Sequence, residues 1–284
     1  MKTIICPTDF SANANNAVNY AAALSEKLKA RIILFHAYEA PVMYTEQPLV
    51  TIQQADEQIR QSGEKKLAAL KTKLLKTHRD LDVETVLTEG ASDAQLIMLS
   101  DKHQADMIVM GTTGTTRLER LLMGSTTARV IRRANCPVLC VPRESKYSGI
   151  KKIVFSTDLH EDNIGSATSL VTFAKHFDAE IIFLYVDDKH LIHSDEEIVR
   201  MTLKIRTKIK YPKISGYISK DPHVTKGIDS FLKKNPADLL VMFTHRKHFP
   251  ETLLHPSVTK MMSQQTKIPL LSLKYSDEAI LSKV

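Results

Sequence analysis

The sequence predicts an α/β protein made of two open, twisted, five-stranded parallel sheets in tandem, each with helices on both faces. A chain of 284 residues is long enough for two domains of ordinary size. Short runs rich in Ile and Val alternate with longer amphipathic segments, as in βαβ units around a parallel sheet, and this alternation occurs twice. Hydrophobic residues at 43% and charged residues at 25% exclude collagen-like, low-complexity and disordered classes.

Four segments of the first half recur in the second half. They are an apolar run ending in Thr-Asp, a run rich in Ile, an Ala-Asp pair before an apolar run, and a Pro before apolar residues. The matching pairs are 4–9 with 153–158, 30–35 with 179–184, 105–110 with 237–242, and 136–139 with 268–271. The offset falls from 149 to 132 residues, so the second copy is shorter by 17 residues. We expect the shortening opposite residues 39–78 of the first copy.

Continuous apolar runs such as 32–35 fit strands that are covered by helices on both faces. In the first copy we expect strands at 2–8, 31–37, 82–88, 106–110 and 137–142, and helices at 12–28, 52–78, 92–103 and 124–134. In the second copy we expect strands at 151–157, 180–186, 211–218, 238–243 and 269–273. The predicted domains are 1–143 and 150–275, with a polar linker between them and a tail at 276–284.

Charge and hydropathy exclude several classes of protein. The net charge of +7 is spread over both halves, and the one basic run, between Arg200 and Lys213, has little aromatic interleaving. We therefore expect no nucleic-acid partner. No stretch approaches the roughly 18 apolar residues of a membrane span, and the first residues lack the apolar core of a signal peptide. We expect a cytoplasmic protein that does not bind membranes.

Three cysteines are present, Cys6, Cys136 and Cys140. The last two fall in one predicted strand, about 13 Å apart at 3.3 Å per residue, which exceeds disulfide reach. Free buried thiols are therefore expected. Histidines at 190 and 193, and at 245, 248 and 255, lack the spacing of a recognised metal site, so no protein metal site is predicted.

Three of the nine glycines, Gly111, Gly114 and Gly124, follow the fourth predicted strand and precede Ser125, Thr126 and Thr127 at a helix start. Glycines allow close backbone approach, and the amino end of a helix favours an anion such as phosphate. Thr8 and Asp9 end the first strand and would meet this loop if the first and fourth strands are neighbours. The alternative is that the glycines only shape a connection and Ser125 only caps a helix.

These segments resemble the universal stress protein family, whose nucleotide-binding members carry G-x2-G-x9-G-[ST] after the fourth strand. Both glycine spacings fit, and residues 5–11 and 135–142 are similar to the family's opening and closing strands. The resemblance covers both copies, so the sequence is identified as a tandem member of the family. It implies an adenine nucleotide alpha hydrolase-like, Rossmann-like fold.

The resemblance also implies that the first copy binds an adenine nucleotide, ATP or else ADP or AMP. A Mg²⁺ ion could bind together with the phosphates. The implied contacts run from the adenosine end through the ribose to the phosphates: Pro7, Thr8, Asp9, Ala37, Met110, Gly111, Gly114, Gly124, Ser125, Thr126 and Thr127. In the family the closing strands form dimer contacts. A tandem chain could make this contact internally as a pseudo-dimer, while a further homodimer and unknown protein partners stay open.

The second copy departs from the motif. Phe243, Arg246 and Pro256 replace the three glycines, although Ser257 and Thr259 remain. Bulky side chains and a proline without an amide donor would fill or disable a phosphate cradle. We therefore expect no ATP binding of the family's kind in the second copy.

Three function classes follow, in order of preference. The first is an ATP-binding regulatory stress protein, with residues 41–48 and the helix at 52–78 as a candidate lid and sheet cover. The second is a slow ATPase or phosphotransferase, which has no evident general base other than Asp9. The third is a scaffold or chaperone-like protein in which the nucleotide plays no regulatory part.

Overall fold

The structure is a computed structural model. It describes six continuous segments, with a few further residues between 196 and 207. These segments are 2–40, 49–112, 125–157, 163–188, 210–244 and 266–274.

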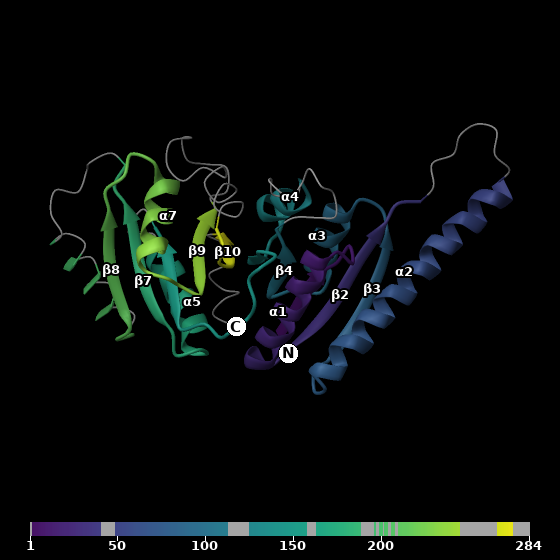
Figure 1. Cartoon of the computed structure of the whole chain (residues 1–284), viewed down its shortest axis with the longest axis horizontal. Helices are drawn as coiled ribbons and strands as arrows, with labels where there is room; N and C mark the ends of the chain where they lie inside the picture. Colours follow the sequence, from purple (N-terminus) through teal and green to yellow (C-terminus); the bar gives the residue numbers. More distant parts are fainter. Residues whose placement is uncertain are drawn as a thin grey trace.

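The first half alternates strands and helices (Figure 1). Its strands are β1 (Lys2–Pro7), β2 (Ala30–Tyr38), β3 (Val83–Glu89), β4 (Met107–Gly111) and β5 (Val138–Val141). Its helices are α1 (Ala12–Leu28), α2 (Leu49–Thr77), α3 (Ser92–Lys102) and α4 (Ser125–Arg133). All nine elements predicted for this half are therefore confirmed.

The second half repeats the pattern within the described residues. Its strands are β6 (Lys152–Ser156), β7 (Glu180–Val186), β8 (Ile214–Ser219), β9 (Leu239–Thr244) and β10 (Leu270–Lys274), and its helices include α5 (Asn163–Lys175) and α7 (Val224–Lys234). The strand expected from 211 begins later, after Pro212, which has no amide hydrogen for a strand ladder. Residues 39–82 join β2 to β3, whereas the shorter segment 187–213 joins β7 to β8, so the missing residues fall where predicted.

The ten strands form one sheet in the order β3-β2-β1-β4-β5-β10-β9-β6-β7-β8. Within each half all pairings are parallel, and the halves join through the antiparallel pair β5 and β10. The α/β fold and the contact between closing strands are as predicted. The two expected five-stranded sheets are thus continuous edge to edge.

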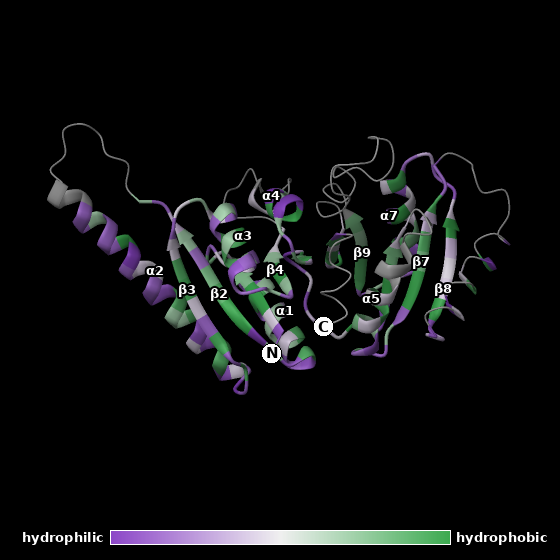
Figure 2. Ribbon diagram, turned by 180° about the vertical axis from the view of Figure 1, so that it is seen from behind, coloured by the Kyte–Doolittle hydropathy of each residue, from purple (hydrophilic) through white to green (hydrophobic). Residues whose placement is uncertain are grey.

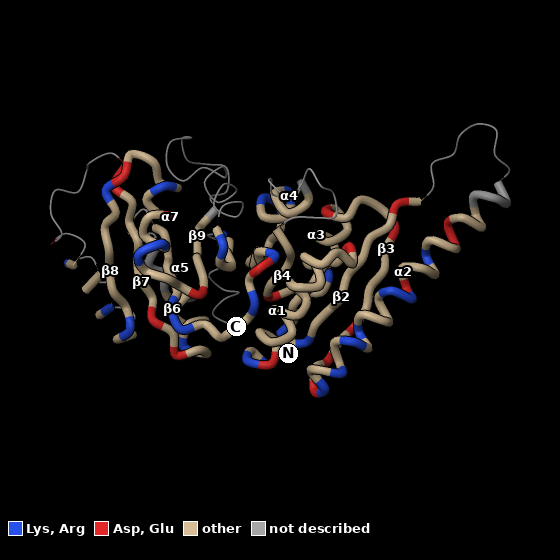
Figure 3. The backbone as a smooth tube through the Cα atoms, in the orientation of Figure 1, with Lys and Arg blue, Asp and Glu red and all other residues tan. Residues whose placement is uncertain are grey.

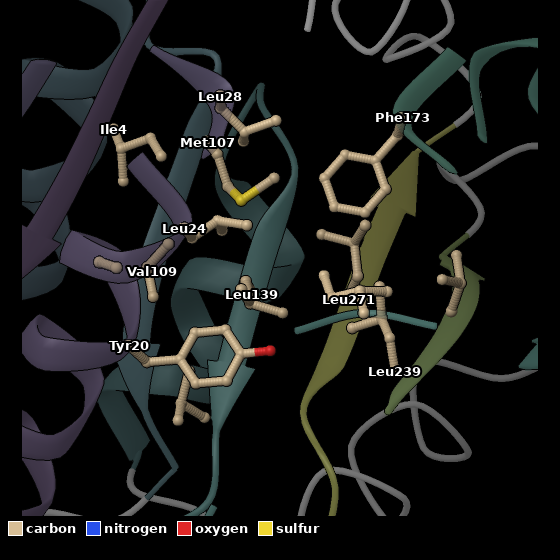
Figure 4. Packing of buried hydrophobic residues seen from close by; sticks show 14 of the residues in the cluster. Ile4, Tyr20, Leu24, Leu28, Met107, Val109, Leu139, Phe173, Leu239 and Leu271 are labelled. Carbon is tan, nitrogen blue, oxygen red and sulfur yellow. The ribbon is translucent and has the colours of Figure 1, made fainter. Parts of the chain in front are cut away.

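Helices cover both faces of the sheet. One buried cluster joins the sheet to α1, α2 and α5, and the other joins it to α3, α4 and α7. Both clusters contain residues of both halves, and Figure 4 shows Leu139 of β5 near Leu271 of β10 beside Phe173 and Tyr20. The strands are apolar along most of their length, and α2 is largely hydrophilic where it lies beside β3 (Figure 2). The junction between the halves is therefore part of the hydrophobic core.

Helix α1 shows how the local sequence sets these boundaries. Ser11 is the N-cap, and its Oγ accepts a hydrogen bond from the Ala14 N–H at 3.1 Å. The helix ends at Lys29, which adopts a left-handed φ of 53°. Small buried residues such as Ala17 and Ala21 let the helix lie close to the sheet. This cap places the β1–α1 turn at the carboxyl edge of the sheet.

The repeated Ala-Asp pair fastens the amino edge of the sheet in both halves. Asp106 accepts the Thr3 N–H at 2.7 Å, and Asp238 accepts the Lys151 and Lys152 N–H groups at 2.7 and 2.9 Å. Each aspartate thereby ties the start of one strand to the start of its neighbour. This part of the repeat serves the fold in both halves.

Charged residues of both signs are distributed over both halves, as the sequence predicts (Figure 3). Among the described residues, no helix is long and apolar enough to cross a membrane.

Candidate functional site

The carboxyl ends of β1 and β4 meet at one edge of the sheet. The two strands pair through Ile4 with Met107 and Ile5 with Ile108, so they are neighbours, as the site prediction required. The chain passes from β1 to β2 on one side and returns from β3 to β4 on the other. Ligand crevices of open α/β sheets lie at such a reversal of strand order.

The turn after β1 is held by its own side chains. Thr8 Oγ1 accepts the Phe10 N–H at 2.9 Å, and Asp9 Oδ1 accepts the Ser11 N–H at 2.9 Å. Thr8 is buried, whereas Asp9 is exposed. Pro7 is half-buried at the end of the strand. This turn presents a fixed acceptor, Asp9, at the predicted adenosine end.

An aromatic contact that the sequence did not predict lies beside this turn. Phe10 has a positive φ of 64°, and its ring lies 4.6 Å from the His36 ring. His36 Nδ1 lies 2.7 Å from the Thr8 carbonyl oxygen, and Lys66 Nζ of α2 lies 5.6 Å from the Phe10 ring centre. The predicted base contact Ala37 follows His36 in β2 and is half-buried. No spacing rule in the sequence links Phe10, His36 and Lys66, because β2 and α2 are far from the turn along the chain.

Gly111 ends β4 where α1 passes close to the strand. A Cβ added to Gly111 would lie 2.6 Å from Asn13 Nδ2 and 2.9 Å from Asn13 Cγ. Asn13 is buried, so a larger residue would require α1 or Asn13 to move. The glycine is therefore required for packing at this point, independently of any ligand.

Helix α4 is attached to the same strand end. Thr127 donates its hydroxyl to the Gly111 carbonyl at 3.1 Å and is 3% exposed. Its side chain thus positions the helix. Thr126 is half-buried in the same first turn, and Ser125 begins the helix. The free amides of this first turn are the groups that can meet an anion.

The remaining predicted contacts divide into two groups. Met110 is 5% exposed and packs in the core, so only its backbone borders the edge. Gly114 and Gly124 lie outside the described residues, as does the candidate lid at 41–48. The structure therefore brings together the ends of β1 and β4 and the start of α4, and does not test the two later glycines.

A surface cavity of about 910 Å³ lies at the opposite, amino edge of the first half. Several of its polar side chains are already bonded within the protein. Arg31 Nε donates to Thr3 Oγ1 at 2.9 Å, and Asn135 Nδ2 donates to Asp101 Oδ1 at 3.0 Å. This cavity lies away from the carboxyl ends of the strands, where ligands of α/β proteins bind.

In the second half, the position equivalent to Gly111 is occupied by a large side chain. Phe243 is 5% exposed, and its ring centre lies 5.3 Å from that of Phe155, which lies 5.2 Å from Phe183. An aromatic cluster thus stands where the first half has a glycine. Asp158, Arg246, Pro256, Ser257 and Thr259 lie outside the described residues.

The thiols are free and buried, as predicted. Burial raises the pKa of Cys6 far above its ordinary value and raises the pKa of Cys140 to about 12. Thiols held neutral in this way are poor nucleophiles. The described residues contain no group of three His, Cys, Asp or Glu side chains that could hold a metal, and the five singled-out histidines lie outside them.

The fold is that of an open α/β protein in which β1 and β4 are neighbours at the point where the strand order reverses. The sequence model of the universal stress protein family matches residues 1–142, and the chain belongs to this family. A universal stress protein of Methanocaldococcus jannaschii is 30% identical over 145 residues, which cover 51% of this chain and 84% of that protein. Another, from Thermus aquaticus, is 30% identical over 142 residues, covering 49% and 98%.

The crystal structure of a universal stress protein from Archaeoglobus fulgidus is similar over the whole chain. Its TM-score is 0.73 at 14% identity, covering 96% of this chain and 98% of that one. This likeness supports the arrangement of all ten strands. The family match itself rests on the first half of the chain.

Proposed function

We propose that this universal stress protein binds an adenine nucleotide, ATP or else ADP or AMP, in its first half and acts as a regulatory stress-response protein. The observation that carries the proposal is the meeting of three groups at one edge. They are the Thr8–Asp9 turn, the end of β4 at Gly111, and the first turn of α4. A nucleotide placed there would have its phosphates at a helix amino end and its adenosine near Asp9 and Ala37.

The residues of the edge fit such a ligand in different ways. Asp9 is exposed and can accept hydrogen bonds from hydroxyl groups, and the backbone of Met110 and Gly111 borders the space between the strands. Thr126, Ser125 and the backbone of Thr127 offer donors for phosphate, and the loop glycines Gly114 and Gly124 complete the motif. Mg²⁺ would bind mainly through the phosphates and water, as it commonly does in nucleotide sites.

We further propose that residues 1–143 and 150–275 are two copies of one domain, which form an internal pseudo-dimer. Leu139 and Leu271 are equivalent positions of the two copies and pair with each other in the antiparallel contact. Such self-matching is what a two-fold, isologous interface requires. A homodimer of chains, the cytoplasmic location and the identity of protein partners stay predictions.

Turnover is not part of this proposal. Asp9 is the base that the sequence singled out at this edge, and its Oδ1 already accepts the Ser11 N–H. A water-activating base would also have to lie within reach of the γ-phosphate. Slow ATP hydrolysis remains the alternative, and incubation with ATP followed by phosphate release would detect it.

The test is mass spectrometry of the ligand released from the purified full-length protein, followed by calorimetric titration with ATP, with and without Mg²⁺. The variants are Gly114→Arg and Gly124→Pro, which introduce the residues of the second half. We expect a single nucleotide per chain in the wild type and loss of binding in both variants, with melting temperatures near that of the wild type. A wild type that carries and binds no nucleotide would reject the proposal and favour a scaffold function.

A further inference from the structure

We infer that Lys274, in the last strand of the second half, is a positioning residue for the nucleotide site of the first half. This inference rests on the proposed nucleotide function. Lys274 holds the carboxyl end of α4, the helix whose amino end would meet the phosphates. The second half would then serve as a brace for the site rather than as a second site.

Lys274 ends β10 and is 4% exposed. Its Nζ donates to the Arg132 carbonyl at 3.1 Å and to the Ala134 carbonyl. The last carbonyls of a helix have no partner within the helix, and a cation there interacts favourably with the helix dipole. A buried ammonium that satisfies these carbonyls therefore fixes where α4 ends.

Side-chain hydrogen bonds join the described residues of α4 to three different elements. Thr127 in its first turn bonds to Gly111 of β4, and Arg129 Nε lies 2.7 Å from Asp93 Oδ2 of α3. Lys274 supplies the third attachment, from the other half of the chain. The helix spans only nine residues, so a shift at its carboxyl end moves its amino end as well. Loss of Lys274 would remove these hydrogen bonds from the second half.

The second half supports a helix of the first half through Lys274, and the sequence has no matching residue for the reverse contact. The position equivalent to Lys274 at the end of the first half is Pro142, under the same offset that relates Leu139 to Leu271. A proline side chain has no donor for a helix terminus. The first half therefore lacks the corresponding residue for the second half, whose own motif has lost its glycines. The intact site and the braced helix occur in the same half.

The experiment compares full-length Lys274→Met with the wild type, using ATP affinity and amide hydrogen exchange. Methionine keeps most of the side-chain volume and removes the donors. The conservative variant is Lys274→Arg, which restores a cation. The control is Asp238→Ala, which removes the amino-edge hydrogen bonds of the second half, at the opposite end of β9 from Thr244, the residue that pairs with Lys274.

We expect ATP binding about tenfold weaker in Lys274→Met, a typical size for coupling between distant groups. We expect Lys274→Arg to bind more tightly than Lys274→Met, and Asp238→Ala to bind as the wild type does. Equal affinity in Lys274→Met and the wild type would overturn the inference. An equal loss in Asp238→Ala would overturn it too, because general destabilisation would then explain both results.

Hydrogen exchange of the wild type keeps the inference testable even if Lys274→Met does not fold. Because coupling is reciprocal, Mg-ATP should slow amide exchange in both α4 and the end of β10. Protection that stops within the first half would overturn the inference while leaving the nucleotide site in place. A wild type that binds no ATP would instead reject the proposed function, so the two failures are distinguishable.

Discussion

The two halves of the chain share their amino edge and differ at their carboxyl edge. At the amino edge, Asp106 and Asp238 make the same kind of hydrogen bond to the start of the neighbouring strand. At the carboxyl edge, Gly111 of the first half leaves space for Asn13, whereas Phe243 of the second half lies in an aromatic cluster. The amino edge therefore maintains the fold in both copies, whereas the carboxyl edge is packed differently in each copy.

The difference shows how a repeated fold can keep its core and change a site. Phe243 contributes apolar burial at the position where Gly111 lies against Asn13 in the first half, so the two halves pack this edge differently. The closing strands stay equivalent, since β5 and β10 pair with each other. Substitutions at matched positions can test which of these residues serve stability and which serve the proposed nucleotide site.

The largest expected effect is at the filled edge. Phe243→Ala removes a buried aromatic ring and should lower the free energy of unfolding by about 3–5 kcal/mol. The reason is the loss of burial together with a cavity beside Phe155. Urea unfolding measures the change. The half-exposed Tyr217→Ala, in the same half, is the control and should cost much less. A cost for Phe243→Ala no greater than the control's would show that the cluster does not stabilise this edge.

Opening the second half should not restore a site. Phe243→Gly creates space at one position, but Arg246 and Pro256 remain in the loop. A chain with Phe243→Gly added to Gly114→Arg should therefore show no nucleotide binding in calorimetry. Binding by that double variant would mean that the second half retains a functional crevice.

Gly111→Ala tests the open edge by a smaller change. The added Cβ would meet Asn13 Nδ2 at 2.6 Å, so the variant should lose about 2–3 kcal/mol through overpacking. Asn13→Ala in the same chain makes room for the methyl group. The double variant should therefore lose less than the sum of the two single changes. If the loss of the double variant equals the sum of the two single losses, the added methyl group does not clash with Asn13.

The sequence predicted the described strands well because their apolar runs are short, continuous and bounded by polar residues. The repeat even located the shortening between β7 and β8. The packing constraint that requires a glycine at position 111 was not predictable, because Asn13 lies against Gly111 only after α1 has packed on β4. Lys274 was missed for the same reason. It looks like a polar residue after a strand, and its burial against α4 exists only once β5 and β10 have paired.

A further comparison concerns the amino edge, which the two halves share. Asp238→Ala removes an acceptor of two backbone N–H groups, and Asp106→Ala removes an acceptor of one. We expect losses of about 1–2 kcal/mol, because an unmade hydrogen bond of a partly buried amide such as Thr3 or Lys152 costs about this much. The loss should be larger for Asp238→Ala, which also removes the acceptor of the exposed Lys151 N–H. Thermal unfolding at pH 7 of both variants measures the order. The reverse order would show that the single bond of Asp106 matters more than the pair.

The last comparison concerns pH and has no expected effect at neutral pH. All three cysteines lie in the first half, and Ser272 of the second half is equivalent to Cys140. Burial raises the pKa of Cys140 from 9.0 to about 12, so the folded protein keeps this proton while the unfolded chain loses it. The contribution is fully present below pH 9 and is lost as the pH rises toward the folded value. Each such thiol should lower the free energy of unfolding by about 1.4 kcal/mol per pH unit in this window.

Cys140→Ala isolates this contribution, because alanine has no proton to lose. Between pH 9 and 11, the free energy of unfolding of the variant should fall less steeply than that of the wild type, by about 1.4 kcal/mol per pH unit. Urea unfolding at several pH values under reducing conditions measures both slopes. Tyr20 shares the direction of the shift, since burial raises its pKa as well, but it is present in both chains and cancels in the difference. Parallel slopes would mean that the Cys140 thiol ionises as readily in the folded chain as in the unfolded one, and that β5 is open to water at the junction of the halves.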